Sequence, residues 1–198
     1  GLEAALAELA LVDGRMGELW ARTGTPDPRA REPGFETLLR TIVYQQLSTR
    51  AAATIWDRLC EACRPMTPET LLAGGDDRLR AAGLSRPKIG YARALAEAVT
   101  GEFDLEGVHR LPDEEAVARL VELRGIGRWS AECYLLFALD RQDIMPADDL
   151  GLATAVRRWL DLDSRPGPGE LRELAEAWRP WRSAAARLLW HSLRMAAI

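Results

Sequence analysis

Two glycines, at positions 125 and 127, constrain this chain most, because each side of the pair has the spacing of a helix. Before them, apolar residues recur with an amphipathic helical period at Ala116, Val117, Leu120 and Val121. After them, residues four positions apart fall on one helical face, namely Trp129, Cys133 and Phe137. Glycine permits backbone angles and close approaches that a side chain would block. The sequence therefore predicts helix, tight turn and helix over residues 122–132.

The predicted turn has the chemistry of a phosphate site. The first amides of a helix have no acceptor inside it and carry the positive end of its dipole. We expect backbone amides to bind a phosphate here, without any dependence on base sequence. The residues expected to contribute are Gly125, Ile126, Gly127 and Arg128. The alternative is a glycine that ends one helix before an ordinary second one. The turn alone does not separate the two interpretations.

The rest of the chain is helical in pattern as well. No alternation of the strand type persists, and short breaks rich in glycine or proline separate the periodic segments. Ser48 and Thr67 are placed to cap helices, and Asp149 stands where another helix begins. We expect an all-α fold of roughly ten helices.

Composition limits the function in three ways. The chain has 198 residues and a net charge of −4, so any nucleic-acid surface must be local. It shows no signal peptide or membrane-length apolar run, and its three cysteines suggest free thiols, so we expect a cytoplasmic protein without membrane attachment. Only one of the 26 basic residues, Lys88, is a lysine, so an amine nucleophile is nearly excluded.

Three further blocks accompany residues 123–131 in a fixed order: residues 42–47, residues 146–150, and residues 178–183 followed by Trp190. Together the four blocks resemble the helix-hairpin-helix DNA glycosylases, and within them the 3-methyladenine DNA glycosylase II (AlkA-like) branch. The similarity covers about residues 33–195. The additional N-terminal β-domain of AlkA has no counterpart before the first block.

The resemblance implies two helical lobes with an active-site cleft between them. One lobe would span residues 35–141 and carry the hairpin, and residues 1–34 with 142–198 would form the other. It further implies a monomer that acts on double-stranded DNA containing alkylated bases, in the bacterial nucleoid. A monovalent cation, Na⁺ or K⁺, is implied at the carbonyls of Leu123 and Ile126, with no other cofactor. An iron–sulfur cluster is not expected, because no cysteine follows Cys133.

Asp149 is the expected catalytic residue, with Asp148 as the alternate. Cleavage of an N-glycosidic bond develops positive charge on the sugar, which a fixed carboxylate stabilises while it also orients or deprotonates water. The start of a helix favours the ionised carboxylate. Asp149 directly precedes Leu150 and lies twenty residues after Trp129, as the resemblance requires. The alternative is a plain helix cap.

The expected base pocket is aromatic. Electron-rich indoles attract cationic alkylated purines, and the resemblance assigns this role to Trp129 and Trp190. Three further candidates for the pocket are Cys133, Tyr134 and Leu150. Cys133 replaces the pocket tyrosine of AlkA. The alternative for large aromatic residues at helical spacing is the protein core.

Other residues are expected to hold the DNA. The resemblance implies that Leu47 and Gln46 enter the space that the extruded base leaves, where an apolar wedge offsets lost stacking. Leu47 could instead pack at a helix end. Ser85 and Lys88 are further candidates for phosphate binding.

The sequence thus predicts a glycosylase that extrudes and excises alkylated bases such as 3-methyladenine and 7-methylguanine. Trp129 stands where strand-nicking relatives carry their Schiff-base lysine, so we expect a monofunctional hydrolase without lyase activity. Two alternatives remain, a glycosylase for deaminated or oxidised bases and a non-catalytic module that binds lesions.

Overall fold

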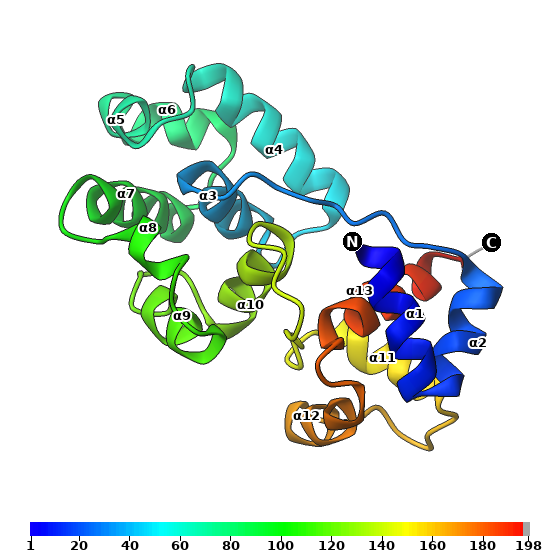
Figure 1. The fold of residues 1–198 in the computed structure, drawn as a ribbon. Helices are drawn as coiled ribbons and strands as arrows, with labels where there is room; N and C mark the ends of the chain where they lie inside the picture. The colour runs from blue at the N-terminus through cyan, green and yellow to red at the C-terminus, as the bar shows by residue number, and fades with distance from the viewer. Residues whose placement is uncertain (196–198) are drawn as a thin grey trace. The chain divides into compact units, whose positions relative to one another are not determined.

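A computed structural model describes residues 1–195, and within them the chain forms thirteen α-helices, one 3₁₀ helix and no strand (Figure 1). The all-α prediction is confirmed. The chain divides into two compact units, one made of residues 1–30 and 135 onward and the other of residues 31–134. The lobe boundary expected from the sequence was 141; the structure changes unit after Tyr134, inside one helix.

The first unit gathers both ends of the chain. Its elements are α1 (Leu2–Val12), α2 (Gly14–Thr23), α11 (Leu150–Trp159), α12 (Pro168–Ala175), η1 (Glu176–Trp178) and α13 (Arg182–Met195). Helix α13 packs against α1, α2 and α11, so it is the centre of this unit. Trp178 is only 1% exposed, and its indole donates to Asp13, the residue that caps α2.

The second unit contains the wedge and hairpin segments. Its elements are α3 (Phe35–Tyr44), α4 (Thr49–Ala62), α5 (Pro68–Ala73), α6 (Gly75–Ala82), α7 (Arg86–Thr100), α8 (Leu105–Val108) and α9 (Asp113–Leu120). Helix α3 packs against α4 and α7, and α10 (Arg128–Phe137) begins in this unit and ends in the other. The predicted caps are confirmed, since Ser48 accepts from the amide of Ala51 and Thr67 from that of Thr70.

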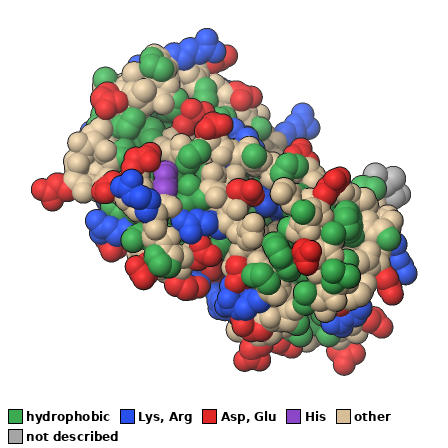
Figure 2. Space-filling model, in the orientation of Figure 1, with side chains coloured by type: hydrophobic (Ala, Val, Ile, Leu, Met, Phe, Trp, Pro, Cys, Tyr) green, Lys and Arg blue, Asp and Glu red, His purple; other side chains and the backbone are tan. Residues whose placement is uncertain are grey.

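Charged side chains are mixed over the protein surface. Figure 2 shows acidic and basic groups interspersed on one face, with apolar side chains between them. No helix within residues 1–195 combines the length and the apolar run that crossing a bilayer requires.

A buried tyrosine ties the start of the second unit to its end. The Tyr134 hydroxyl accepts a hydrogen bond of 2.8 Å from the amide of Gly34 and shares another, also 2.8 Å, with Nε2 of His109. The side chain is 1% exposed, and burial raises the pKa of Tyr134 from 10.0 to about 12. This placement favours a packing role for Tyr134 over the base-pocket role expected from the sequence.

We predict that Tyr134→Phe lowers the unfolding free energy by about 1 kcal/mol at pH 7, because Gly34 and His109 lose a partner. Between pH 10 and about 12 the unfolded tyrosine loses its proton while the folded one keeps it. The unfolded state then binds fewer protons, so wild-type stability falls by about 1.4 kcal/mol per pH unit in that window. Urea unfolding of both proteins from pH 7 to 11 measures the difference. Parallel pH curves would contradict this assignment.

Candidate active site

Asp149 caps the helix that follows it, as the sequence predicted, and a second group also holds its carboxylate. Oδ1 of Asp149 accepts from the amide of Leu152 at 2.8 Å and from the indole Nε1 of Trp190 at 3.0 Å. Asp149 and Trp190 are 41 residues apart, and both belong to the first unit. The structure therefore brings the expected catalytic carboxylate together with one of the two expected pocket indoles.

The loop that leads to Asp149 is fixed against the start of α13. Ser183 donates its amide to the carbonyl of Gln142 at 3.0 Å, and its hydroxyl accepts from the amide of Ile144 at 3.0 Å. Arg182 also forms an ion pair of 2.6 Å with Asp143. The backbone of Asp149 is then placed by its own amide, which donates to the carbonyl of Pro146 at 3.0 Å. These bonds join the start of α13 to residues 142–144, the stretch of the loop that directly precedes residues 146–150.

Trp190 is itself held by an aromatic and cationic stack. Its ring lies 5.6 Å from that of Phe137 at an interplanar angle of 24°. The guanidinium of Arg187 sits 5.6 Å from the Phe137 centroid and donates to the carbonyl of Leu136 at 2.7 Å. Arg187 is 6% exposed, and burial lowers its pKa. Phe137 and Arg187 carried no site role in the sequence analysis, because Phe137 lies on α10 and meets Trp190 and Arg187, both on α13, only in the folded protein.

Asp148 has different surroundings from Asp149. Its carboxylate is 39% exposed and pairs with Arg172 at 3.0 Å. Exposed ion pairs of this kind contribute little to stability. The pair does commit Asp148 to a cation on α12, which favours Asp149 as the reacting group. Leu150, a third residue of this segment, is 67% exposed.

The hairpin has the close approach that its glycine predicted. Gly125 has a φ of 91°, and a Cβ there would lie 2.5 Å from Cγ of Tyr91. The amide of Ile126 donates to the carbonyl of Leu123 at 3.0 Å, so that amide is used inside the turn. Of the two carbonyls expected to hold a cation, that of Leu123 is the acceptor of this bond.

The start of α10 offers the remaining amides. The first-turn amides of a helix have no acceptor inside it, and this helix begins at Arg128 directly after Gly127. The Arg128 side chain is bound to two carboxylates, Glu132 at 2.8 Å and Glu114 at 2.9 Å, and these bonds raise its pKa. The guanidinium of Arg128 is thus already bound to carboxylates, so its backbone amide is the better candidate for binding a phosphate.

The expected wedge lies at the end of α3. Gln46 has a φ of 55°, an uncommon left-handed conformation for a residue with a side chain, and Leu47 is 40% exposed. Gln45 joins this turn to the hairpin, since its Nε2 donates to the carbonyl of Gly125 at 2.8 Å and to Ser130 Oγ at 3.1 Å. Sequence analysis missed Gln45, because its partners are 80 and 85 residues away.

Lys88 has a structural contact that the sequence did not reveal. Its ammonium donates to the carbonyls of Val43 and Gln45, both at 2.7 Å, and so satisfies the end of α3. Burial lowers its pKa. Two of the three donors are therefore occupied by the protein, while Ser85, at the start of α7, is exposed.

The other pocket candidates lie on α10. Trp129 is half-buried and belongs to the second unit, whereas Trp190 belongs to the first. Cys133 is 7% exposed and Tyr134 is 1% exposed, so both are largely covered. Within residues 1–195, no group of three or more His, Cys, Asp or Glu side chains is placed to hold a metal ion.

Gly151 is a site residue that the sequence analysis also missed. A Cβ added there would lie 2.9 Å from Oδ1 of Asp149 and 3.6 Å from Cδ1 of Trp190. Only glycine leaves the carboxylate in its observed place between Leu152 and Trp190. Helical periodicity treats a glycine in the first turn as neutral, so no sequence signal marked this role.

We predict that Gly151→Ala destabilises the protein by about 1 kcal/mol, because the new methyl displaces Asp149 from its two donors. Gly90→Ala is the matched control, since Gly90 is also helical but a Cβ there meets nothing within 4 Å. The control should gain about 0.5–1 kcal/mol from helix propensity. Urea unfolding of the two variants tests the contrast, and equal gains would contradict the role of Gly151.

Known proteins share both the sequence and the fold. Residues 39–180 match the family model described as HhH-GPD superfamily base excision DNA repair protein. DNA-3-methyladenine glycosylase 1 of Schizosaccharomyces pombe is 36% identical over 84% of this chain and 75% of its own. DNA-3-methyladenine glycosylase 2 of Escherichia coli is 30% identical over 92% of this chain and 66% of its own.

A solved structure gives the same result. The Schizosaccharomyces pombe 3-methyladenine DNA glycosylase Mag1, in complex with abasic DNA, superposes with a TM-score of 0.87 and 32% identity, over 98% of each chain. The family resemblance drawn from the four sequence blocks is confirmed. This chain therefore belongs to the HhH-GPD superfamily of base excision DNA repair proteins.

Proposed function

We propose that this protein is a monofunctional DNA glycosylase that binds double-stranded DNA as a monomer and hydrolyses the N-glycosidic bond of alkylated bases. The observation that carries the proposal is the Asp149 carboxylate, held by an amide and an indole in a family of base excision repair proteins. The names of its relatives, 3-methyladenine glycosylases from yeast and bacteria, favour 3-methyladenine as a target. The proposal extends to 7-methylguanine on the resemblance of the four sequence blocks alone.

Asp149 would act on the sugar. As the bond to the base breaks, positive charge grows on the sugar ring, and a carboxylate that is already oriented stabilises it without reorganisation. The same carboxylate can accept a proton from the attacking water. Its position at the start of α11 places the first helix amides and the positive end of the helix dipole beside the carboxylate. The reaction then needs only water and the protein's own groups.

Trp190 would serve both the carboxylate and the base. Its indole N–H is directed at Asp149, and Phe137 stacks on one face of the ring. The other face is then the surface for stacking on an extruded base. A methylated purine carries positive charge, which an indole face attracts by cation–π and stacking forces. The pocket role of Trp129, which belongs to the second unit, stays a prediction from the sequence.

The second unit would hold the DNA. A Gln46–Leu47 turn with a left-handed residue and an exposed leucine suits a wedge that fills the vacated base position. Gln45 bonds this turn to the hairpin, so the wedge and the phosphate-binding amides have a fixed relation. Amides at Gly127 and Arg128 would hold a phosphate.

The lysine inventory supports hydrolysis without strand nicking. A lyase needs an amine that forms a Schiff base, and Trp129 occupies the position that such a lysine has in nicking relatives. Lys88 is the only lysine, and its ammonium is bound to the carbonyls of Val43 and Gln45. We propose that the product is an abasic site in an intact strand.

We predict that Asp149→Asn lowers the single-turnover rate of base release from alkylated duplex by at least about 100-fold. Asparagine is a good helix cap, so the variant should fold. Asp148→Asn is the matched control and should stay within a few-fold of wild type, because Asp148 is an exposed partner of Arg172. Duplexes with uracil or 8-oxoguanine, run in parallel, test the alternative substrate classes. Undiminished release by Asp149→Asn would refute the role of this carboxylate.

We also predict that the protein leaves the DNA strand uncut. Borohydride treatment during turnover should trap no covalent protein–DNA adduct, and denaturing gels should show nicks only after alkali. Lys88→Met is a useful comparison, since loss of its two hydrogen bonds should lower stability without creating or removing any nicking. Adduct formation that disappears in Lys88→Met would show that this lysine is an active amine.

A further inference from the structure

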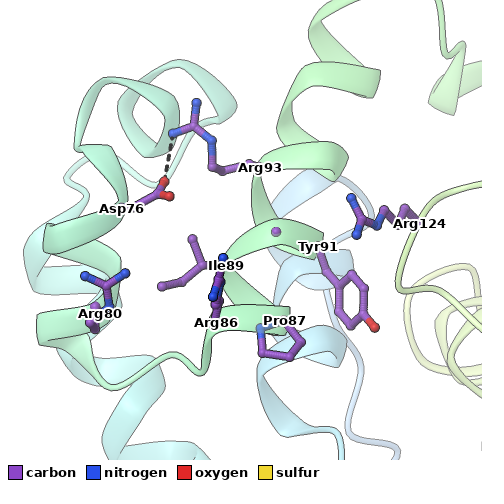
Figure 3. A pocket seen from close by; sticks show the side chains of 9 residues that line it. Asp76, Arg80, Arg86, Pro87, Ile89, Tyr91, Arg93 and Arg124 are labelled. Carbon is purple, nitrogen blue, oxygen red and sulfur yellow. Dashed lines mark hydrogen bonds and ion pairs between the residues drawn. The ribbon is translucent and has the colours of Figure 1, made fainter.

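The second unit has a recess that no expected site residue lines. It measures about 590 Å³ and is formed by α6, α7 and the turn before the hairpin (Figure 3). Four arginines line it, with a single carboxylate among them: Arg80, Arg86, Arg93, Arg124 and Asp76. In a chain of net charge −4, this is a local concentration of positive charge. Such a concavity attracts anions.

The arginines differ in how far the protein already uses them. Arg93 pairs with Asp76 at 3.2 Å, and Arg80 pairs with Asp77 at 2.8 Å. Among residues 1–195, Arg86 forms no hydrogen bond or ion pair. Within the same residues, the guanidinium of Arg124 makes only a cation–π contact, 5.8 Å from the ring centroid of Tyr91. In Figure 3 Arg86 lies between Arg80 and Arg124. Two guanidinium groups therefore keep their hydrogen-bonding capacity for a ligand.

A glycine forms part of the wall of the recess. Gly90 lies within α7, where glycine costs about 1 kcal/mol relative to alanine. A Cβ at Gly90 would meet nothing within 4 Å, and its φ is not in the left-handed region. Neither packing nor backbone conformation thus requires this glycine. The wall of the recess is therefore open at this position, beside the arginines.

The recess adjoins the turns that are proposed to hold DNA. Arg124 immediately precedes Gly125, and Tyr91, which lines the recess, is the side chain that Gly125 approaches. Pro87 and Tyr91 also line a second hollow, which includes the wedge residues Gln46 and Leu47. Lys88 faces the carbonyls of α3, so the arginines are the cations available on this side of α7.

We propose that this four-arginine recess binds a backbone phosphate of duplex DNA beyond the hairpin, with Arg86 and Arg124 as its principal ligands. The inference rests on the DNA-binding part of the proposed function. A guanidinium fork matches phosphate oxygens in pairs, which is why arginine suits this role. The contact would set the length of the DNA footprint without reading base sequence.

The test measures how DNA affinity depends on salt. Each neutralised phosphate contributes about 0.9 to the slope of log affinity against log salt, so Arg86→Gln/Arg124→Gln should lower that slope by about one. The probe is a duplex with a stable tetrahydrofuran abasic analogue, followed by fluorescence anisotropy from 50 to 200 mM KCl, a range of roughly fourfold in salt. Arg58→Gln/Arg110→Gln is the matched control, because both arginines are exposed, belong to the same unit and lie outside the recess.

A second pair of variants tests the space instead of the charge. Gly90→Phe should fill the recess and weaken binding, whereas Gly90→Ala should bind as wild type does. Shortening the duplex on the side of the lesion that reaches the recess should lower the affinity of wild type to that of the double variant. Shortening it on the other side should not have this effect. A slope unchanged in Arg86→Gln/Arg124→Gln, an equal loss in the control, or unchanged binding by Gly90→Phe would overturn the proposal.

Two further outcomes separate the proposal from its alternatives. If inorganic phosphate alone raises the melting temperature of wild type but not of the double variant, while the DNA slopes agree, the recess holds a free anion and the proposal is overturned. Base release from alkylated duplex is measured separately, because the abasic analogue cannot be cut. If the salt slope depends on the recess arginines but no base is released, the glycosylase activity is refuted while the DNA contact is supported.

Discussion

The hydrogen bond from the Trp190 indole to the Asp149 carboxylate is the interaction on which the candidate site depends. A carboxylate that only capped α11 would have a single donor, the local backbone amide, and could still rotate about its side-chain torsions. The second donor, from α13, fixes its plane relative to a ring that could stack on a base. Because both donors reach the same oxygen, the cap and the indole select one orientation of the carboxylate. Catalytic geometry and helix capping are therefore served by a single arrangement.

Local features of the site could be predicted from sequence, and long-range ones could not. The caps at Ser48, Thr67 and Asp149 each depend on the residue three positions away, so composition and spacing identify them. Gln45 and Lys88 make their decisive contacts across 43 to 85 residues, and nothing near them in sequence marks those contacts. Periodicity likewise predicted most helices but missed the four-residue α8, which is too short to show a period.

The distribution of cations follows from the use of the single lysine. Lys88 donates to the carbonyls at the end of α3, so the proposed DNA contacts rely on arginine side chains and backbone amides. Amides at a helix start hold a phosphate at short range and without specificity, whereas a guanidinium reaches further and acts through charge. A protein of net negative charge can thus attach to DNA through a few local contacts, without a basic face that would bind any polyanion.

Three glycines of this protein show how one residue type meets three different physical requirements. Gly125 has a left-handed backbone and lies against Tyr91, so both its φ and its surroundings exclude a side chain. Gly151 has an ordinary helical backbone, and only the nearby carboxylate of Asp149 excludes a Cβ. Gly90 has neither constraint, and its surroundings are empty. Since helix propensity disfavours glycine inside a helix, Gly90 is the one of these three positions at which alanine should stabilise the protein.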